Sequence, residues 1–210
     1  KGYGEPRSAK EFSELAQWVN YDGHRSLFES RSQNRKGLLM WMSHSCWPSM
    51  VWQTYDYYFE PTAAYFAIKK ASEPLHIQWN PVTDEVEVVN YSAGSHKGLV
   101  AKVQVLNMDA SVAWEKEVTT DSNEDTTNKC IKLEFPDNLS KVHFIKMVLT
   151  ENGKVISENF YHRTLEENNY QDLRNLPKVA LKSDITTNKD TDGNWSGTVV
   201  IENTTSTPAL

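Results

Sequence analysis

The chain has 210 residues, of which 39% are hydrophobic and 24% are charged, as in an ordinary soluble globular protein. Its formal net charge of −6 argues against nucleic-acid binding, because affinity for phosphates comes largely from clustered Lys and Arg. No run approaches the roughly 20 apolar residues that a membrane-spanning helix needs, so no membrane span is expected.

The N-terminal part is predicted to be helical. Ser8 followed by Glu11 is typical of a capping box, in which each side chain satisfies an amide of the first turn. Gly23 marks a candidate break or kink. Apolar residues at helical spacing predict one buried face, made of Phe12, Leu15, Ala16, Val19, Leu27 and Phe28. Basic residues and a terminating glycine indicate the end of this helix: Arg31, Arg35, Lys36 and Gly37.

Residues 38–42 (LLMWM) are apolar at every position, which favours a strand buried on both faces, as in a parallel sheet covered by helices. A second helix is expected over 60–72, with Pro61 at its first position and two lysines, Lys69 and Lys70, in its last turn. Helix, buried strand, loop and helix together are typical of an α/β fold. One strand with two helices cannot close a sheet by itself.

The loop between these elements is rich in rings that either pack a core or bind a sugar: Trp41, Trp47, Trp52, Tyr55, Tyr57, Tyr58 and Phe59. Trp and Tyr offer a flat apolar face with a polar tip, which suits the C–H faces and hydroxyl rim of a sugar. The alternative is that the rings fill the interface between the helical part and the sandwich. Tyr57 and Tyr58 are expected to pack against a helix. Asp56 is interpreted as a structural hydrogen-bond acceptor.

The remaining reactive residues show no recognisable catalytic or metal-binding spacing. Cys46 and Cys130 are expected to be separate buried thiols, and Cys46 and His44 lack a third orienting residue for nucleophilic chemistry. Five further histidines are interpreted as surface or hydrogen-bonded core residues: His24, His76, His96, His143 and His162. No cofactor or metal is expected.

After Pro74 the period of the pattern changes from about 3.6 to 2, which indicates strands. In residues 99–105, the apolar side chains of Leu99, Ala101, Val103 and Val105 alternate with others, which predicts that one face of this strand is buried and dry while the other faces solvent. Asn152-Gly153 predicts a hairpin, because both residues tolerate positive φ. Seven short runs predict an antiparallel, immunoglobulin-like sandwich: 75–79, 85–91, 99–107, 112–118, 130–135, 142–150 and 154–161.

The domain boundaries follow from these shifts in pattern. Residues 1–73 form the helical part, 74–163 the sandwich and 164–177 a polar linker. Residues 178–210 begin another β pattern around Asp192-Gly193, with too few strands for a core of their own. The chain is therefore expected to be a piece of a longer protein.

Residues 37–78 resemble the end of the catalytic barrel in glycoside hydrolase family 2, in the branch of exo-β-glucosaminidases and β-mannosidase-like enzymes. Residues 3–31 resemble the helical segment before the last barrel strand of these enzymes. The ends of the sandwich and linker, 158–163 and 175–182, resemble their tandem C-terminal immunoglobulin-like domains. The resemblance implies the final strand–helix portion of a (β/α)8 barrel, then one complete immunoglobulin-like β-sandwich and the start of a second.

The resemblance also implies a function, namely the C-terminal part of a retaining β-glycosidase acting on glucosaminides or mannosides. The two catalytic carboxylates of such enzymes lie upstream, so the chain alone is expected to be inactive. Trp41 matches an aromatic residue at the sugar site, with His44 and Trp47 beside it. Many β-mannosidases carry Asn-Asp where this chain has His44 and Ser45, which leaves the sugar preference open.

The implied partners are the carbohydrate substrate and the remainder of the parent glycosidase, and the implied location is secreted or periplasmic. The alternative function is a non-catalytic carbohydrate-binding module or a structural β-sandwich module. Residues 38–42 distinguish the two, because a strand buried on both faces needs sheet neighbours that a binding module of this length would lack.

Overall fold

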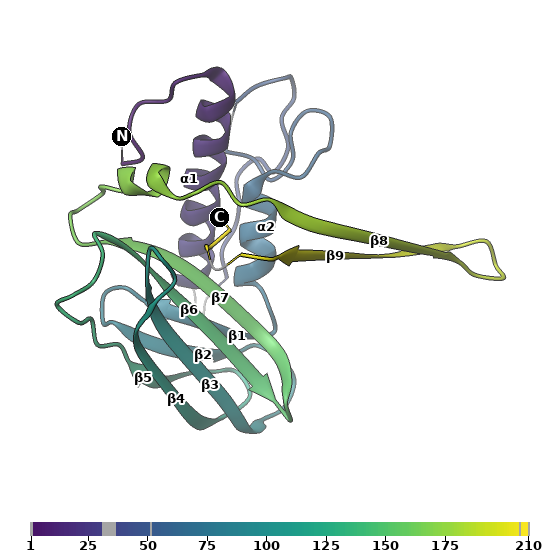
Figure 1. The fold of residues 1–210 in the computed structure, drawn as a ribbon. Helices are drawn as coiled ribbons and strands as arrows, with labels where there is room; N and C mark the ends of the chain where they lie inside the picture. The colour runs from purple at the N-terminus through teal and green to yellow at the C-terminus, as the bar shows by residue number, and fades with distance from the viewer. Residues whose placement is uncertain (1, 31–36, 51, 206, 210) are drawn as a thin grey trace.

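The computed structural model describes residues 2–30, 37–50, 52–205 and 207–209 (Figure 1). Within these residues the protein is mostly β-structure, with few helices. The elements, in chain order, are α1 (Ala9–Ser30), α2 (Ala63–Ala71), β1 (Leu75–Asn80), β2 (Glu85–Asn90), β3 (His96–Asn107), β4 (Val112–Ser122), β5 (Thr126–Lys132), β6 (Val142–Glu151), β7 (Lys154–Thr164), the 3-10 helix η2 (Gln171–Asn175), β8 (Leu181–Lys189) and β9 (Trp195–Asn203).

Strands β1 to β7 form an antiparallel β-sandwich, as predicted. One sheet has the order β1-β2-β5 and the other β4-β3-β6-β7. Side chains from both sheets meet in one apolar core, in which Leu99, Ala101 and Val103 are the predicted dry face of β3. Strands β3, β4 and β7 are each longer at one end than the predicted runs, and β5 is shifted to begin at Thr126, because Thr126 to Lys129 pair with the end of β2.

The β6–β7 hairpin turns at Asn152 and Gly153, which have φ values of 51° and 77°, and this confirms the predicted turn. In contrast, α1 continues without interruption through Gly23, so the candidate break at this glycine was wrong. A methyl group added at Gly23 would meet nothing within 4 Å. The two glycines therefore have opposite roles, one required by the backbone and one not.

We expect Gly153→Ala to lower the free energy of unfolding by about 1–2 kcal/mol, because a Cβ atom is strained at positive φ. Gly23→Ala is expected to raise it by about 0.5–1 kcal/mol, since alanine favours an exposed helix interior. Urea denaturation of the two variants measures both changes. Shifts in the same direction would contradict this assignment of roles.

Helix α1 begins where the capping pattern predicts. The Ser8 hydroxyl accepts a hydrogen bond from the Glu11 amide at 3.1 Å. The Glu11 carboxylate accepts its bond from the Arg7 amide, one residue before the position that a capping box would use. The basic residues 31–36, predicted to end the helix, lie outside the described residues.

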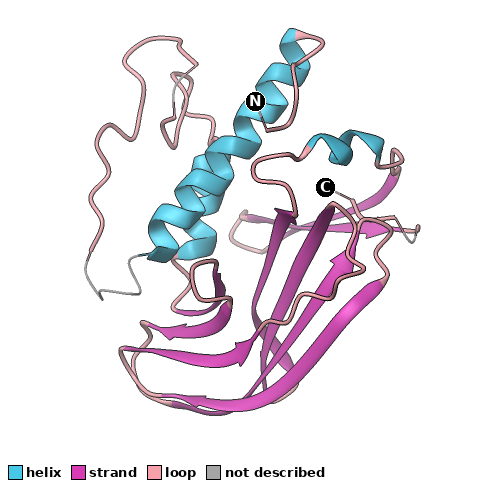
Figure 2. Ribbon diagram, turned by 90° about the vertical axis from the view of Figure 1, so that its left-hand side faces the viewer, coloured by secondary structure: helices cyan, strands magenta, loops and turns pink. Residues whose placement is uncertain are grey.

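The orientation of α1 is the largest difference from the prediction. Phe12, Val19 and Leu27 are 48%, 58% and 49% exposed, whereas the buried residues of the helix are Arg25, Phe28 and Glu29. The helix lies beside the sandwich (Figure 2) and turns a charged stripe toward it. The predicted apolar face is therefore largely open, with Leu15 half-buried and Phe28 buried, because polar side chains of β1 and β7 cover the opposite face.

Helix α2 packs beside α1 (Figure 1). Its N-cap is Thr62, so Pro61 precedes the helix instead of starting it, while Lys69 and Lys70 occupy the last turn as predicted. Thr62 makes no capping hydrogen bond with its own side chain. Instead, Gln17 of α1 accepts a hydrogen bond from the Ala63 amide at 2.8 Å, which ties the start of α2 to α1.

Residues 38–42 do not form the predicted buried strand. Leu39 is 97% exposed and Trp41 is 80% exposed, and the backbone has no strand conformation there. A strand buried on both faces needs hydrogen-bonding neighbours on a sheet. The described part of the chain supplies no such neighbours to residues 38–42. Their apolar pattern alone therefore does not make them a strand.

The C-terminal residues form a separate two-stranded sheet, β8–β9, that projects away from the sandwich (Figure 1). Every residue of both strands is exposed. The predicted β pattern is present, and the linker before it contains the short helix η2. The division of the chain into domains at 73, 163 and 177 stays a prediction.

Candidate functional site

We call residues 37–62, which connect α1 to α2, the aromatic segment. Its backbone is held by a few local contacts instead of a sheet. His44 and Tyr55 form an isolated parallel bridge, and the Tyr55 amide donates to the Ser43 carbonyl at 3.1 Å. The Ser45 hydroxyl donates to Gln53 at 2.7 Å. These contacts fold the segment into a loop whose two arms lie side by side.

His44 is fixed within this loop. Its ring stacks on Phe59, with centroids 4.3 Å apart and planes inclined by 17°. The Nε2 atom is buried and has no hydrogen-bond partner among the described residues. A buried polar atom without a partner costs free energy. Nε2 of His44 is therefore an unsatisfied hydrogen-bonding position.

The two tryptophans of the predicted sugar site are open to solvent. Trp41 is 80% exposed and Trp47 is 68% exposed. Tyr57 and Tyr58, expected to pack against a helix, contact each other edge to face at 5.2 Å and are themselves exposed. Within the described residues the aromatic segment is therefore mostly a surface.

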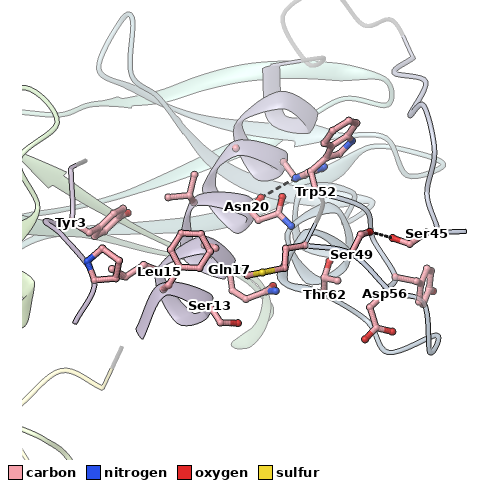
Figure 3. Close-up of a pocket in the computed structure, with 18 of the residues that line it drawn as sticks. Tyr3, Ser13, Leu15, Gln17, Asn20, Ser45, Ser49, Trp52, Asp56 and Thr62 are labelled. Carbon is pink, nitrogen blue, oxygen red and sulfur yellow. Dashed lines mark hydrogen bonds between the residues drawn. The ribbon is translucent and has the colours of Figure 1, made fainter. Parts of the chain in front are cut away.

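A groove with a volume of ≈ 800 Å³ lies between α1 and the aromatic segment (Figure 3). The open apolar face of α1 forms one wall, and Ser49, Met50, Trp52 and Thr62 belong to the other. Trp41, His44 and Trp47 are not among the described residues that line it. The structure thus places the predicted site residues on the same segment as the groove without bringing them into it.

Potential catalytic groups near the groove have structural roles. Asp56 accepts hydrogen bonds from the amides of Tyr58 and Glu60 at 2.8 and 2.9 Å, which confirms its interpretation as a structural acceptor.

Cys46 is an exposed free thiol, so its predicted burial was wrong, because the loop that carries it is open. The described residues include no cluster of His, Cys, Asp or Glu that could hold a metal ion, and no described helix could span a membrane.

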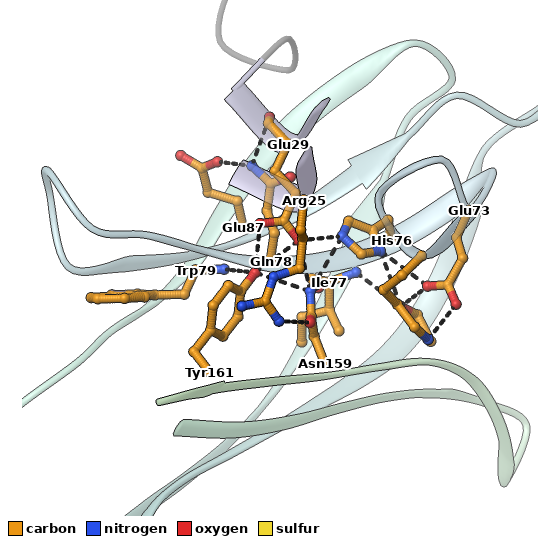
Figure 4. A network of polar contacts seen from close by, with 12 residues as sticks. Arg25, Glu29, Glu73, His76, Ile77, Gln78, Trp79, Glu87, Asn159 and Tyr161 are labelled. Carbon is orange, nitrogen blue, oxygen red and sulfur yellow. Dashed lines mark hydrogen bonds and ion pairs between the residues drawn. The ribbon is translucent and has the colours of Figure 1, made fainter. Parts of the chain in front are cut away.

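A buried polar network joins α1 to the sandwich (Figure 4). We call it the junction network, and its members are Asp22, Arg25, Glu29, Glu73, His76, Ser157, Asn159 and Tyr161. Arg25 pairs with Asp22 at 2.9 Å and donates to Asn159 and to the Phe160 carbonyl. Its guanidinium carbon lies 4.0 Å from the centre of the Tyr161 ring.

Glu29 and His76 form the centre of the junction network. The Glu29 carboxylate accepts from Asn159 and from the Tyr161 hydroxyl, both at 2.9 Å, and pairs with His76 Nε2 at 3.1 Å. On the other side of the ring, His76 Nδ1 lies 3.0 Å from Glu73 Oε2. This confirms the interpretation of His76 as a hydrogen-bonded core residue.

The surroundings of His76 and of Glu73 shift the pKa of each side chain. Burial acts to lower the pKa of His76, but its hydrogen bonds to Glu29 and Glu73 outweigh burial and raise the pKa above its ordinary value. Burial likewise acts to raise the pKa of Glu73. Hydrogen bonds from His76, Lys70 and Ser157 overcome it and lower that pKa to about 2.

Sequence reasoning missed the junction network. The signal present in the sequence was the helical spacing of Asp22, Arg25 and Glu29, opposite the apolar stripe of α1. Charged residues at this spacing are typical of a solvated face, so the pattern alone would not have revealed burial.

No protein-family model matches the chain. It is 30% identical to an exo-β-D-glucosaminidase of Streptomyces avermitilis over 99% of its own length and 26% of that protein. It is also 30% identical to a mannosylglycoprotein endo-β-mannosidase of Lilium longiflorum, over 76% of the chain and 18% of the relative.

Among solved structures, the exo-chitosanase of Amycolatopsis orientalis aligns with a TM-score of 0.88 and 28% identity, over 96% of this chain and 27% of that one. The homologues are thus glycoside hydrolases, and the chain spans about a quarter of the length of the first of them. The homologues of this chain are exo-β-D-glucosaminidases and β-mannosidases of glycoside hydrolase family 2.

Proposed function

We propose that this chain is the C-terminal part of a retaining β-glycoside hydrolase that acts on β-linked glucosaminides or mannosides. The observation that carries the proposal is 30% identity to an exo-β-D-glucosaminidase over 99% of the chain. A retaining mechanism needs two carboxyl groups about 5–5.5 Å apart, one as acid/base and one as nucleophile. In this proposal both belong to the remainder of the parent protein.

The open surfaces of the helical part support an origin in a (β/α)8 barrel. Helix α1 leaves Phe12, Val19 and Leu27 exposed, and the groove beside it is lined by further apolar side chains. Contiguous exposed apolar surface usually marks an interface. The preceding part of the barrel would cover this surface and supply the sheet neighbours that residues 38–42 lack here.

The chain contributes one wall of the sugar site through the aromatic segment. The exposed face of Trp41 would stack on the C–H face of a sugar ring, and Trp47 would extend the apolar wall. His44 is the third residue of this proposed wall, and its ring is held against Phe59. Export to the periplasm or the cell exterior stays a prediction.

The test is the full-length parent enzyme assayed on p-nitrophenyl β-D-glucosaminide and β-D-mannoside. We expect Trp41→Ala to reduce kcat/KM about 30-fold or more, since truncating a central aromatic contact costs roughly 2 kcal/mol. Trp195→Ala, which removes an exposed ring from β9, is the matched control and should leave kcat/KM unchanged.

Two outcomes would overturn the proposal. One is turnover of either aryl glycoside by the 210-residue chain alone, because stacking cannot replace two placed carboxylates. The other is a parent protein inactive on both substrates while the chain binds oligosaccharides, which would favour the alternative of a non-catalytic binding module.

A further inference from the structure

His76 lies between two carboxylates that come from different parts of the chain. Its Nε2 atom is 3.1 Å from Glu29 of α1, and its Nδ1 atom is 3.0 Å from Glu73 at the end of the α2–β1 connection. The His76 side chain is only 2% exposed, and that of Glu29 7%. The ring is therefore held from both sides in a place that water barely reaches.

This geometry determines how many protons the ring needs. A neutral imidazole carries one N–H, and its second nitrogen presents a lone pair. That lone pair would face a carboxylate oxygen at 3.0 or 3.1 Å, which is repulsive, and the alternative donors, Asn159 Nδ2 at 3.4 Å from Nε2 and Ser157 Oγ at 3.5 Å from Nδ1, lie farther away. Only the doubly protonated ring donates to both Glu29 and Glu73, and the resulting bonds are charge-assisted.

Every element packed against the His76 ring contributes charged or polar side chains to its surroundings. Helix α1 provides Asp22, Arg25 and Glu29, and the end of α2 and the connection after it provide Lys70 and Glu73, which pair at 2.6 Å. Strands β1 and β2 provide Gln78 and Glu87, which are hydrogen-bonded to each other. Strand β7 provides Ser157, Asn159 and Tyr161.

We propose that Glu29, His76 and Glu73 form a proton-dependent lock between α1, the end of α2 and the sandwich. The lock is closed while the ring carries two protons, and it opens when the ring loses one of them. Opening weakens the attachment of α1, because Glu29 is the contact between His76 and that helix, while Arg25 and the bonds from Asn159 and Tyr161 to Glu29 remain. The lock does not depend on the proposed enzymatic function.

The direction of the pH dependence follows from the two pKa shifts. The pKa of His76 is raised above 6.5, so its contribution is complete below pH 6.5 and is lost as the pH rises through the raised value. The pKa of Glu73 is lowered from 4.5 to about 2, so its contribution is complete above pH 4.5 and is lost as the pH falls toward 2. The lock is thus strongest in weakly acidic solution.

The direct test is an NMR titration of the 15N-histidine-labelled 210-residue chain. We expect both ring nitrogens of His76 to be protonated at pH 6.5, with a titration midpoint above that value. In parallel, amide hydrogen exchange of α1, corrected for the intrinsic rate, should show protection falling by up to about tenfold per pH unit between pH 6.5 and the midpoint, and levelling off above the midpoint.

Two variants separate the lock from other histidines. His76→Gln removes the titrating group and should abolish this pH dependence of α1 protection. His96→Gln removes a half-buried histidine that pairs with Glu151 on the sandwich, and should leave the dependence intact. A His76 midpoint at or below 6.5, or an unchanged dependence in His76→Gln, would overturn the proposal. The titration of the unmodified chain decides it even when His76→Gln does not fold.

Discussion

Replacing Arg25 with Met is expected to lower the free energy of unfolding by about 3–5 kcal/mol, the usual cost of removing one partner from a buried ion pair. The Arg25 side chain is 5% exposed and pairs with Asp22 at 2.9 Å. Methionine preserves much of the length and apolar volume. It removes the guanidinium from Asp22, which keeps only its contact with His162 Nε2 at 3.1 Å among ion-pair partners in the described residues, and it removes the Arg25 donor from the Phe160 carbonyl.

Urea denaturation monitored by tryptophan fluorescence measures this loss. Lys10→Met is the matched control, since Lys10 lies on the same helix in an ion pair with Glu14 whose side chains are 86% and 62% exposed. Such surface pairs contribute little, so this variant should unfold like the unmodified chain. Equal losses in the two variants would show that the buried Arg25–Asp22 pair stabilises the fold no more than the exposed Lys10–Glu14 pair does.

Leu149→Ala is expected to cost about 2–5 kcal/mol, because it removes a fully buried side chain and leaves a cavity. Leu149 lies on β6, is 0% exposed and packs in the core shared by the two sheets of the sandwich. The midpoint of urea denaturation should fall while its slope with urea concentration stays constant. That combination indicates lost stability without a change in the surface exposed on unfolding.

The control for this substitution is Val155→Ala on the neighbouring strand β7. Val155 is 59% exposed, so shortening it leaves no cavity in the core. It should change the midpoint far less than Leu149→Ala does. A large effect at Val155 together with a small one at Leu149 would contradict the assignment of the inner face of this sheet.

The strands of the sandwich could be predicted from the sequence because their signal is local. Leu99, Ala101 and Val103 alternate with polar residues, and a period of 2 places one set on a single face whatever the partner strand is. The turn at Asn152-Gly153 is equally local, since it depends on the φ values that these two residues tolerate.

The packing of α1 could not be predicted in the same way. Its amphipathic pattern was correct, yet the charged side is the buried one. Arg25 meets Asn159, which is 134 residues away in the sequence, and no local pattern identifies such a partner. An apolar stripe indicates that some surface will cover it, and it does not indicate which one.

The candidate sugar site lies between these two cases. The sequence pointed to Trp41, His44 and Trp47, and the structure places all three on the aromatic segment, where their role in binding stays a prediction. The strand expected at 38–42 is absent because strand formation depends on neighbours. The unpartnered Nε2 of His44 depends on the folded loop around it, which the sequence pattern does not specify.

The distance in sequence between the two sides of the junction network also has a consequence for synthesis on the ribosome. Arg25 is made 134 residues before Asn159, which corresponds to a delay on the order of 10 s at roughly 5–20 residues per second. During that interval the charged stripe of α1 stays hydrated and does not favour premature association. The nascent helix can thus be completed before its sandwich exists, and the last sandwich strand, β7, supplies the side chains that finally bury it.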